Sequence, residues 1–356
     1  DELLDVERIL SGDDQTETGL SFNRCKPVAE WIRLFTNLPE SLLSVLHDIY
    51  GDDPHLIKER QETYLTVLQR FSEQYGSSRR VVIARSPGRV NLMGRHIEHR
   101  GGNINVISIN KEVITVASLA DDPRLVRMTN TNPDFPDRFF DIAAHFETVN
   151  WDSWLNFLDS DKIKKMVTDS QGDWMNYVKA PILRLQYLYR DKKLLGMDMA
   201  FTGNIPVAAG LSSSSAIVVA SAEAAVALNQ LDVTPQSFVD LCGEGEWFVG
   251  SRGGAGDHAA MKFGVRGTVT SLGFYPFGPR GSFAFPDGYR LLIANSYVKA
   301  NKTTNAKDTF NQRVASYEFA VMLIKDRHPE YATLIQHLRD INSETLGVKP
   351  SLIYKL

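Results

Sequence analysis

The segment from Pro206 to Ala216 constrains the fold of this chain more than any other part of its sequence. It reads Pro-Val-Ala-Ala-Gly-Leu-Ser-Ser-Ser-Ser-Ala, so a glycine bend leads into four consecutive hydroxyl side chains and then into a small-residue, apolar stretch that predicts a helix. A bend before a helix leaves backbone N–H groups unpaired at the positive end of the helix dipole, where phosphate binds readily. Serine hydroxyls there can also ligate Mg²⁺. The alternative is an ordinary serine cap on a core helix.

Two further glycine-rich segments have the composition of ligand-binding loops. Residues 86–102 read Ser-Pro-Gly-Arg-Val-Asn-Leu-Met-Gly-Arg-His-Ile-Glu-His-Arg-Gly-Gly and follow a strand-like run, Val81 to Ala84. Residues 250–258 read Gly-Ser-Arg-Gly-Gly-Ala-Gly-Asp-His and follow a helix-like stretch. Closely spaced glycines allow backbone to approach a ligand.

Together the three segments resemble the motifs of the small-molecule kinase family that includes galactokinase, homoserine kinase, mevalonate kinase and phosphomevalonate kinase. Residues 87–96 are similar to the sugar-kinase signature Pro-Gly-Arg-Val-Asn-Leu-x-Gly-x-His, and Trp174 to Val178 resembles a further galactokinase segment. The resemblance runs from about Leu65 to Glu318. It implies an α+β fold, with a ribosomal-protein-S5-like amino-terminal domain, a ferredoxin-like carboxy-terminal domain and an active site between them.

The order of predicted elements divides the chain into three regions. We expect residues 1–76 to form a leader and a helical appendage with a break at Pro39, and residues 77–280 to form the amino-terminal kinase domain. Residues 281–356 would begin the carboxy-terminal domain, which we expect to be incomplete because no glycine pair follows Gly254 to supply the family's third motif. The predicted strands cover 81–84, 104–109, 112–120, 124–129, 195–203 and 289–295, and the predicted helices beyond residue 76 cover 174–189, 213–229, 235–250 and 311–325.

Composition favours small-molecule chemistry. The 356 residues are 43% hydrophobic and carry a formal net charge of −4, which offers no basic field for nucleic acid or an acidic membrane. No apolar run approaches the roughly 20 residues of a spanning helix. Cys25 and Cys242 form neither a disulfide framework nor a zinc site, and no signal-peptide pattern opens the sequence. We therefore expect a cytoplasmic monomer that binds a small-molecule sugar and neither nucleic acid nor membrane.

Phosphoryl transfer requires a phosphate cradle, stabilisation of charge and a group that orients the attacking hydroxyl. Neither the P-loop motif nor the protein-kinase motifs occur in this sequence, which excludes those two ATP-binding machineries. The resemblance implies ATP and Mg²⁺ instead, with Ser214 as the expected metal contact. The implied ATP- and phosphate-binding residues are Gly210, Leu211, Ser212, Ser213, Ser214 and Ser215.

Asp257 and Arg89 are the implied catalytic residues. The resemblance makes Asp257 the aspartate that contacts the acceptor hydroxyl, whereas turn chemistry alone would make it a capping residue in a glycine-rich turn. Arg89 sits on a predicted Pro-Gly turn at a strand end. A fixed guanidinium there can hold Asp257 ionised and offset charge on the transferred group. The alternative for Arg89 is a solvated surface arginine.

Arg95, His96 and Glu98, together with Asp257, are the implied sugar contacts. Galactokinases usually carry Glu-His-x-Asp where this chain has Arg-His-Ile-Glu, which changes sugar recognition more than phosphate chemistry. The His-x-Glu-His pattern also permits a metal site, although its spacing supplies no fourth ligand.

Two glutamates and one aromatic residue complete the implied site. The family places a Mg²⁺-linked glutamate near Glu244 and Glu246; Glu246 is the expected metal residue, although the spacing leaves both open. Phe310 stands where the family has a tyrosine near the sugar.

The sequence thus predicts an ATP-dependent kinase for the anomeric C1 hydroxyl of galactose or a related sugar. One alternative is a kinase for galacturonate or another uronic acid. A second is a catalytically silent sensor that binds ATP and sugar, and a third is a different acceptor, such as homoserine or mevalonate.

Overall fold

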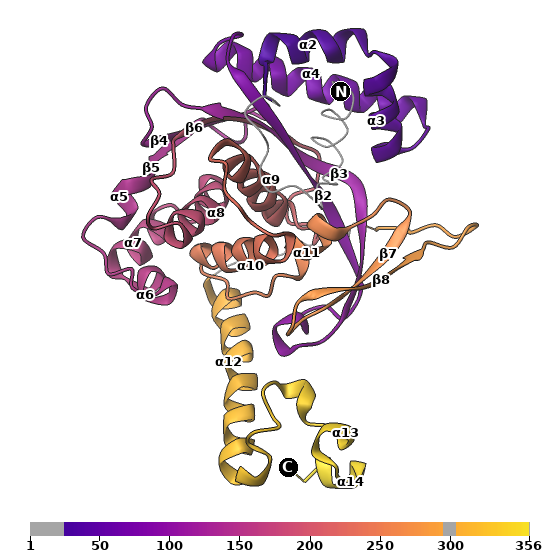
Figure 1. The fold of residues 1–356 in the computed structure, drawn as a ribbon, viewed down its shortest axis with the longest axis vertical. Helices are drawn as coiled ribbons and strands as arrows, with labels where there is room; N and C mark the ends of the chain where they lie inside the picture. The colour runs from indigo at the N-terminus through magenta and orange to yellow at the C-terminus, as the bar shows by residue number, and fades with distance from the viewer. Residues whose placement is uncertain (1–24, 295–303, 356) are drawn as a thin grey trace.

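An eight-stranded sheet organises the part of the chain that this computed structural model describes, residues 25–294 and 304–355 (Figure 1). The expected leader lies outside the described residues. The main path of the sheet runs β1-β2-β3-β6-β4-β5, while β7 pairs with the first residues of β3 and with β8. Only the β4–β6 pair is parallel among the strand pairs of the described residues. The strands are β1 (Lys26–Pro27), β2 (Arg80–Met93), β3 (Ile104–Leu119), β4 (Leu125–Asn130), β5 (Arg138–Asp141), β6 (Met197–Gly203), β7 (Thr268–Gly273) and β8 (Gly278–Ala284).

Three helices cover one face of the sheet and confirm the predicted helical appendage. They are α2 (Val28–Asn37), α3 (Glu40–Tyr50) and α4 (Pro54–Tyr75). Pro39 immediately precedes α3, where its fixed φ starts a new helix, and the Asp53 side chain caps α4 by accepting from the His55 N–H. Their apolar side chains form one buried core with Ile83, Ile114 and other sheet residues. This layer is therefore an integral part of the sheet's packing.

The opposite face is covered by helices that carry the candidate site. They are α8 (Met175–Leu188), α9 (Ser213–Leu228), α10 (Pro235–Glu246) and α11 (Gly256–Phe263), with α5 (Ile142–Phe146), α6 (Trp154–Asp159) and α7 (Asp161–Asp169) beside them. Helix α9 is buried on almost every side because its many alanines let neighbouring elements approach closely. The predicted α+β class is confirmed for the described residues.

The carboxy-terminal region contains helices and extended segments. Helix α12 (Thr304–Arg327) includes the predicted helix over 311–325 and extends away from the sheet (Figure 1). Two short helices follow, α13 (Ser343–Leu346) and α14 (Pro350–Ile353). Because the described residues beyond Ala284 contain no strand, the ferredoxin-like fold stays a prediction.

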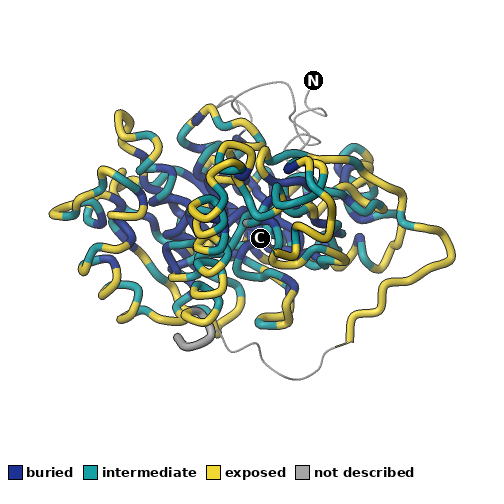
Figure 2. The backbone as a smooth tube through the Cα atoms, turned by 90° about the horizontal axis from the view of Figure 1, so that it is seen from below, coloured by how far each residue is buried: buried dark blue, intermediate teal, exposed yellow. Residues whose placement is uncertain are grey.

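Three local predictions were wrong. Residues 104–109 and 112–120 do not form two strands; they belong to the single strand β3, which pairs with both β2 and β6. The Pro87-Gly88 sequence is not a turn at a strand end but a register shift inside β2, because proline cannot donate to the ladder. No strand forms over residues 289–294: this run is exposed and has no partner strand among the described residues, as Figure 2 shows, and Asn295 lies outside them.

None of the helices within residues 25–294 and 304–355 combines the length and apolar character needed to cross a bilayer.

Candidate active site

Arg89 joins the three glycine-rich segments in space. Its Nε atom donates to Asp257 Oδ1 at 2.7 Å, and its Nη1 atom donates to the Gly210 carbonyl at 2.7 Å. The residue is 8% exposed, so the guanidinium is fixed and largely shielded from water. The register shift in β2 presents it, and Gly88 is needed there because a Cβ would lie 3.1 Å from the Leu211 carbonyl oxygen. The structure thus brings the two predicted catalytic residues together.

The connection that leads to α9 turns sharply before the helix begins. Ala208, Gly210 and Ser212 have φ angles of 58°, 76° and 62°, so left-handed residues alternate along it. Ser212 occupies the cap position of α9, yet its side chain makes no capping bond. Its hydroxyl instead donates to Asp257 Oδ2. For Ser212, the alternative of an ordinary helix cap is therefore wrong.

The electrostatic surroundings keep Asp257 ionised. Burial alone would raise the pKa of this carboxyl, but the Arg89 guanidinium and the Ser212 hydroxyl outweigh burial and lower the pKa below its usual value. Both carboxylate oxygens accept hydrogen bonds from these two residues. An ionised, oriented carboxylate of low basicity can accept a hydrogen bond from a hydroxyl and hold it in position.

The two candidate glutamates on α10 face different surroundings. Glu246 Oε2 accepts from the Ser215 hydroxyl at 2.8 Å and lies 2.9 Å from His258 Nε2, next to the start of α9. Glu244 is paired with Arg184, away from that position. Residues two apart on a helix point in different directions, so only one of them can reach the serine turn. Glu246 is therefore the candidate that lies near it, together with Ser213 and Ser214 in the first turn of α9.

The three predicted sugar contacts lie on the loop after β2. Glu98 is 8% exposed, and burial, with a smaller contribution from the charge of Asp257, raises the pKa of its carboxyl. His96 has a φ of 63° and meets the Phe310 ring edge-on at 5.4 Å between centroids. Burial and the adjacent Arg95 lower the pKa of His96, so its ring is neutral at pH 7. Arg95 itself is exposed.

A metal site in this loop has no support from the described residues. No group of three or more His, Cys, Asp or Glu side chains in that part of the chain is arranged to hold a metal ion.

Sequence reasoning missed two features of the site. A Cβ on Gly254 would lie 2.3 Å from Glu98 Cγ, so the absence of a side chain there gives Glu98 its space. The glycine run was the available signal, but the sequence did not identify its contact. Asn311 on α12 bonds the Gly250 carbonyl and the Arg252 N–H, which ties α12 to the loop before Asp257. The sequence contained no signal for that contact.

Comparisons with known families cover both halves of this site. The galactokinase galactose-binding signature matches residues 69–119, which include Arg89, Arg95, His96 and Glu98. The GHMP kinase amino-terminal domain matches residues 176–265, which include the serine turn, Glu246 and Asp257.

Relatives of similar sequence share one name. The chain is 28% identical to a galactokinase of Schizosaccharomyces pombe over 74% of this chain and 50% of that protein. It is 24% identical to a galactokinase of Dictyostelium discoideum, over 88% and 59% of the two chains. It spans about half to three fifths of the length of these relatives. The crystal structure of Lactococcus lactis galactokinase complexed with galactose shares the fold, with a TM-score of 0.58 and 23% identity over 82% of this chain and 69% of that one.

The motifs, the fold and these matches agree, and the chain belongs to the GHMP kinase family. Within this family it is galactokinase-like.

Proposed function

We propose that this protein is an ATP-dependent sugar kinase that phosphorylates the anomeric C1 hydroxyl of galactose or a closely related sugar. The observation that carries the proposal is the contact of Arg89 with both Asp257 and the Gly210 carbonyl, directly before the amino-terminal end of α9. This contact joins a carboxylate that can orient a hydroxyl to a turn that can receive phosphate. The galactokinase-like sequence supports galactose as the acceptor.

In this proposal Asp257 orients the acceptor. Its lowered pKa makes it a weak base, but the attacking hydroxyl becomes acidic only late in a loose phosphoryl-transfer transition state. Positioning therefore contributes more than proton affinity does. Arg89 holds the carboxylate and places positive charge beside the turn, where negative charge on the transferred group would be stabilised. Glu98 and His96 would contact the sugar's other hydroxyls.

The residues at the start of α9 fit a nucleotide with Mg²⁺. Left-handed turns at Gly210 and Ser212 direct the chain into a helix start, which favours phosphate. Ser214 and Glu246 are the residues that would hold the metal, consistent with the small number of protein ligands that Mg²⁺ takes when phosphates supply the others. When bound, Mg²⁺ supplies charge neutralisation on the phosphates.

A panel of acceptors tests this function. ATP consumption should depend on galactose or a related sugar, the product should carry phosphate at C1, and Asp257→Asn should abolish that dependence. Homoserine and mevalonate should not support turnover. Binding of ATP and sugar by calorimetry, without turnover, would favour the sensor alternative over the kinase.

A further inference from the structure

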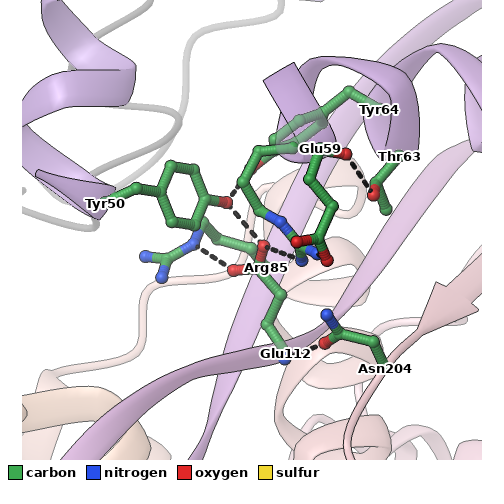
Figure 3. A network of polar contacts seen from close by, with 8 residues as sticks. Tyr50, Glu59, Thr63, Tyr64, Arg85, Glu112 and Asn204 are labelled. Carbon is green, nitrogen blue, oxygen red and sulfur yellow. Dashed lines mark hydrogen bonds and ion pairs between the residues drawn. The ribbon is translucent and has the colours of Figure 1, made fainter. Parts of the chain in front are cut away.

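A buried carboxylate outside the candidate active site is held by three side chains (Figure 3). Glu112 on β3 is 1% exposed. Its Oε1 atom accepts from Tyr50 Oη at 2.6 Å and from Arg60 Nη1 at 3.3 Å, and its Oε2 atom accepts from Arg85 Nε at 2.9 Å. Tyr64 Oη lies 3.0 Å from Tyr50 Oη and extends the network. A carboxylate this deeply buried requires such partners.

The partners of Glu112 come from two layers of the fold. Tyr50 is the last residue of α3 and Arg60 lies on α4, whereas Arg85 lies on β2. Arg60 is also 1% exposed, so without Glu112 it would be a buried cation that had lost its buried partner. The network therefore fixes the position of the helical layer relative to the two central strands.

The main chain of Glu112 holds the connection that leads to the serine turn. Its N–H donates to Asn204 Oδ1 at 2.8 Å, and its carbonyl accepts from the Asn204 N–H at 3.1 Å. Asn204 follows β6 directly and begins the segment that contains Gly210 and Ser212. A Cβ on the preceding Gly203 would lie 3.3 Å from the Glu112 carbonyl, so the two backbones are closely apposed.

The same residue lies beside the strand irregularity that presents Arg89. Glu112 is paired with Pro87 in the β2–β3 register, and the register shift follows immediately, before Arg89 pairs with Ser108. One residue of β3 thus borders both the strand segment that carries Arg89 and the origin of the turn whose carbonyl Arg89 contacts.

We propose that Glu112 is a positioning residue for the candidate active site, through which α3 and α4 fix the relative placement of Arg89 and the Gly210–Ser212 turn. This inference rests on the proposed function for its catalytic consequence. Displacements well below 1 Å at reacting groups are enough to reduce turnover strongly. Glu112 itself would touch neither sugar nor nucleotide.

Two variants test the network by activity. Tyr50→Phe removes only a hydroxyl, and we expect it to lower kcat about 3- to 10-fold; Glu112→Gln should lower kcat about 10- to 100-fold, with smaller changes in KM for either substrate. The control is Phe71→Leu, a fully buried change on the same helix α4 that removes packing against Tyr75 but no bond of the network. It should lower Tm and leave kcat unchanged below the unfolding transition.

Hydrogen exchange tests the positioning independently of activity. In Tyr50→Phe and Glu112→Gln, amides of residues 205–212 should exchange at least several-fold faster than in the wild type, whereas Phe71→Leu should leave them protected. If wild-type protein phosphorylates no sugar but these amides respond, the proposed function fails and the positioning stands. Unchanged exchange and unchanged kcat in Tyr50→Phe would overturn the inference, even where Glu112→Gln does not fold.

Discussion

Arg89 Nε lies 2.7 Å from Asp257 Oδ1 across 168 residues of sequence, and the same guanidinium contacts the turn before α9. This relationship joins strand β2, the serine turn and the start of α11 into one site. The ion pair is mostly shielded from solvent, since the Arg89 side chain is 9% exposed and that of Asp257 is 32% exposed. Screening by salt should therefore weaken it less than it weakens an exposed pair.

The hydroxyl of Ser212 should set the acidic limb of activity. It donates to Asp257 and helps to lower the pKa of that carboxyl, so Ser212→Ala should raise the pKa and move the acidic limb of kcat/KM to higher pH. Loss of a hydrogen bond to a charged group should also lower kcat/KM about tenfold. Ser213→Ala, one residue further along, is the control. Identical pH profiles for Ser212→Ala and wild type would show that this bond does not act on Asp257.

Adjacent glycines offer a matched pair for the sugar loop. A Cβ on Gly254 would lie 2.3 Å from Glu98 Cγ, whereas a Cβ on Gly253 meets no atom within 4 Å. Gly254→Ala should displace Glu98 and raise KM for the sugar by about tenfold or more, a loss of about 1.4 kcal/mol, with little effect on KM for ATP. Gly253→Ala should leave both constants near the wild-type values. Equal sugar KM in the two variants would remove Glu98 from the sugar contacts.

Arg95 should influence the choice between neutral and acidic sugars. It is exposed on the sugar loop, close enough to His96 to help lower the pKa of that ring. A guanidinium can bind a sugar carboxylate through two hydrogen bonds, whereas it cannot accept a bond from a neutral hydroxyl. We expect galacturonate to be used at least as well as galactose, and Arg95→Glu to shift the kcat/KM ratio toward galactose by tenfold or more. A strong wild-type preference for galactose that the substitution leaves unchanged would exclude this role.

His145 should make stability depend on pH. Burial, assisted by nearby Lys179 and Lys162, lowers its pKa to about 4, although its bond to the Asp141 carbonyl opposes the shift. The unfolded chain binds this proton near pH 6.5, so the protein should lose stability as pH falls from about 6.5 to 4, by about 3 kcal/mol at most. His145→Asn should flatten this part of the curve in urea unfolding at several pH values. An unchanged slope would contradict the assignment to His145.

Local sequence patterns predicted most helices because those helices have strong local signals. Pro39 marked the start of α3, and the glycine-serine transition marked the start of α9. The continuous strand β3 was not predicted because Asn110 and Lys111 interrupt its apolar pattern, and pairing with β2 and β6 overrides that local preference. The apolar run at 289–294 shows the converse, since a strand does not form without a partner.

The site could be predicted in its residues but not in its contacts. The motifs brought Arg89 and Asp257 to attention, but the spacing could not distinguish Glu244 from Glu246; that required the packing of α10 against the start of α9. The Glu112 network was beyond prediction, because Tyr50 and Arg60 reach it across 62 and 52 residues with no shared motif.

Sugar-dependent turnover of ATP in Asp257→Asn and Arg89→Ala, measured beside nucleotide affinity, tests the central claim most directly. Asp169→Asn, an exposed carboxylate paired with Lys165, is the control. If Asp257 orients the acceptor and Arg89 fixes it, each site variant should lower kcat by about 10²-fold or more, while the Kd for ATP changes by less than about threefold and the control matches wild type. Near-normal kcat in Asp257→Asn would contradict the account.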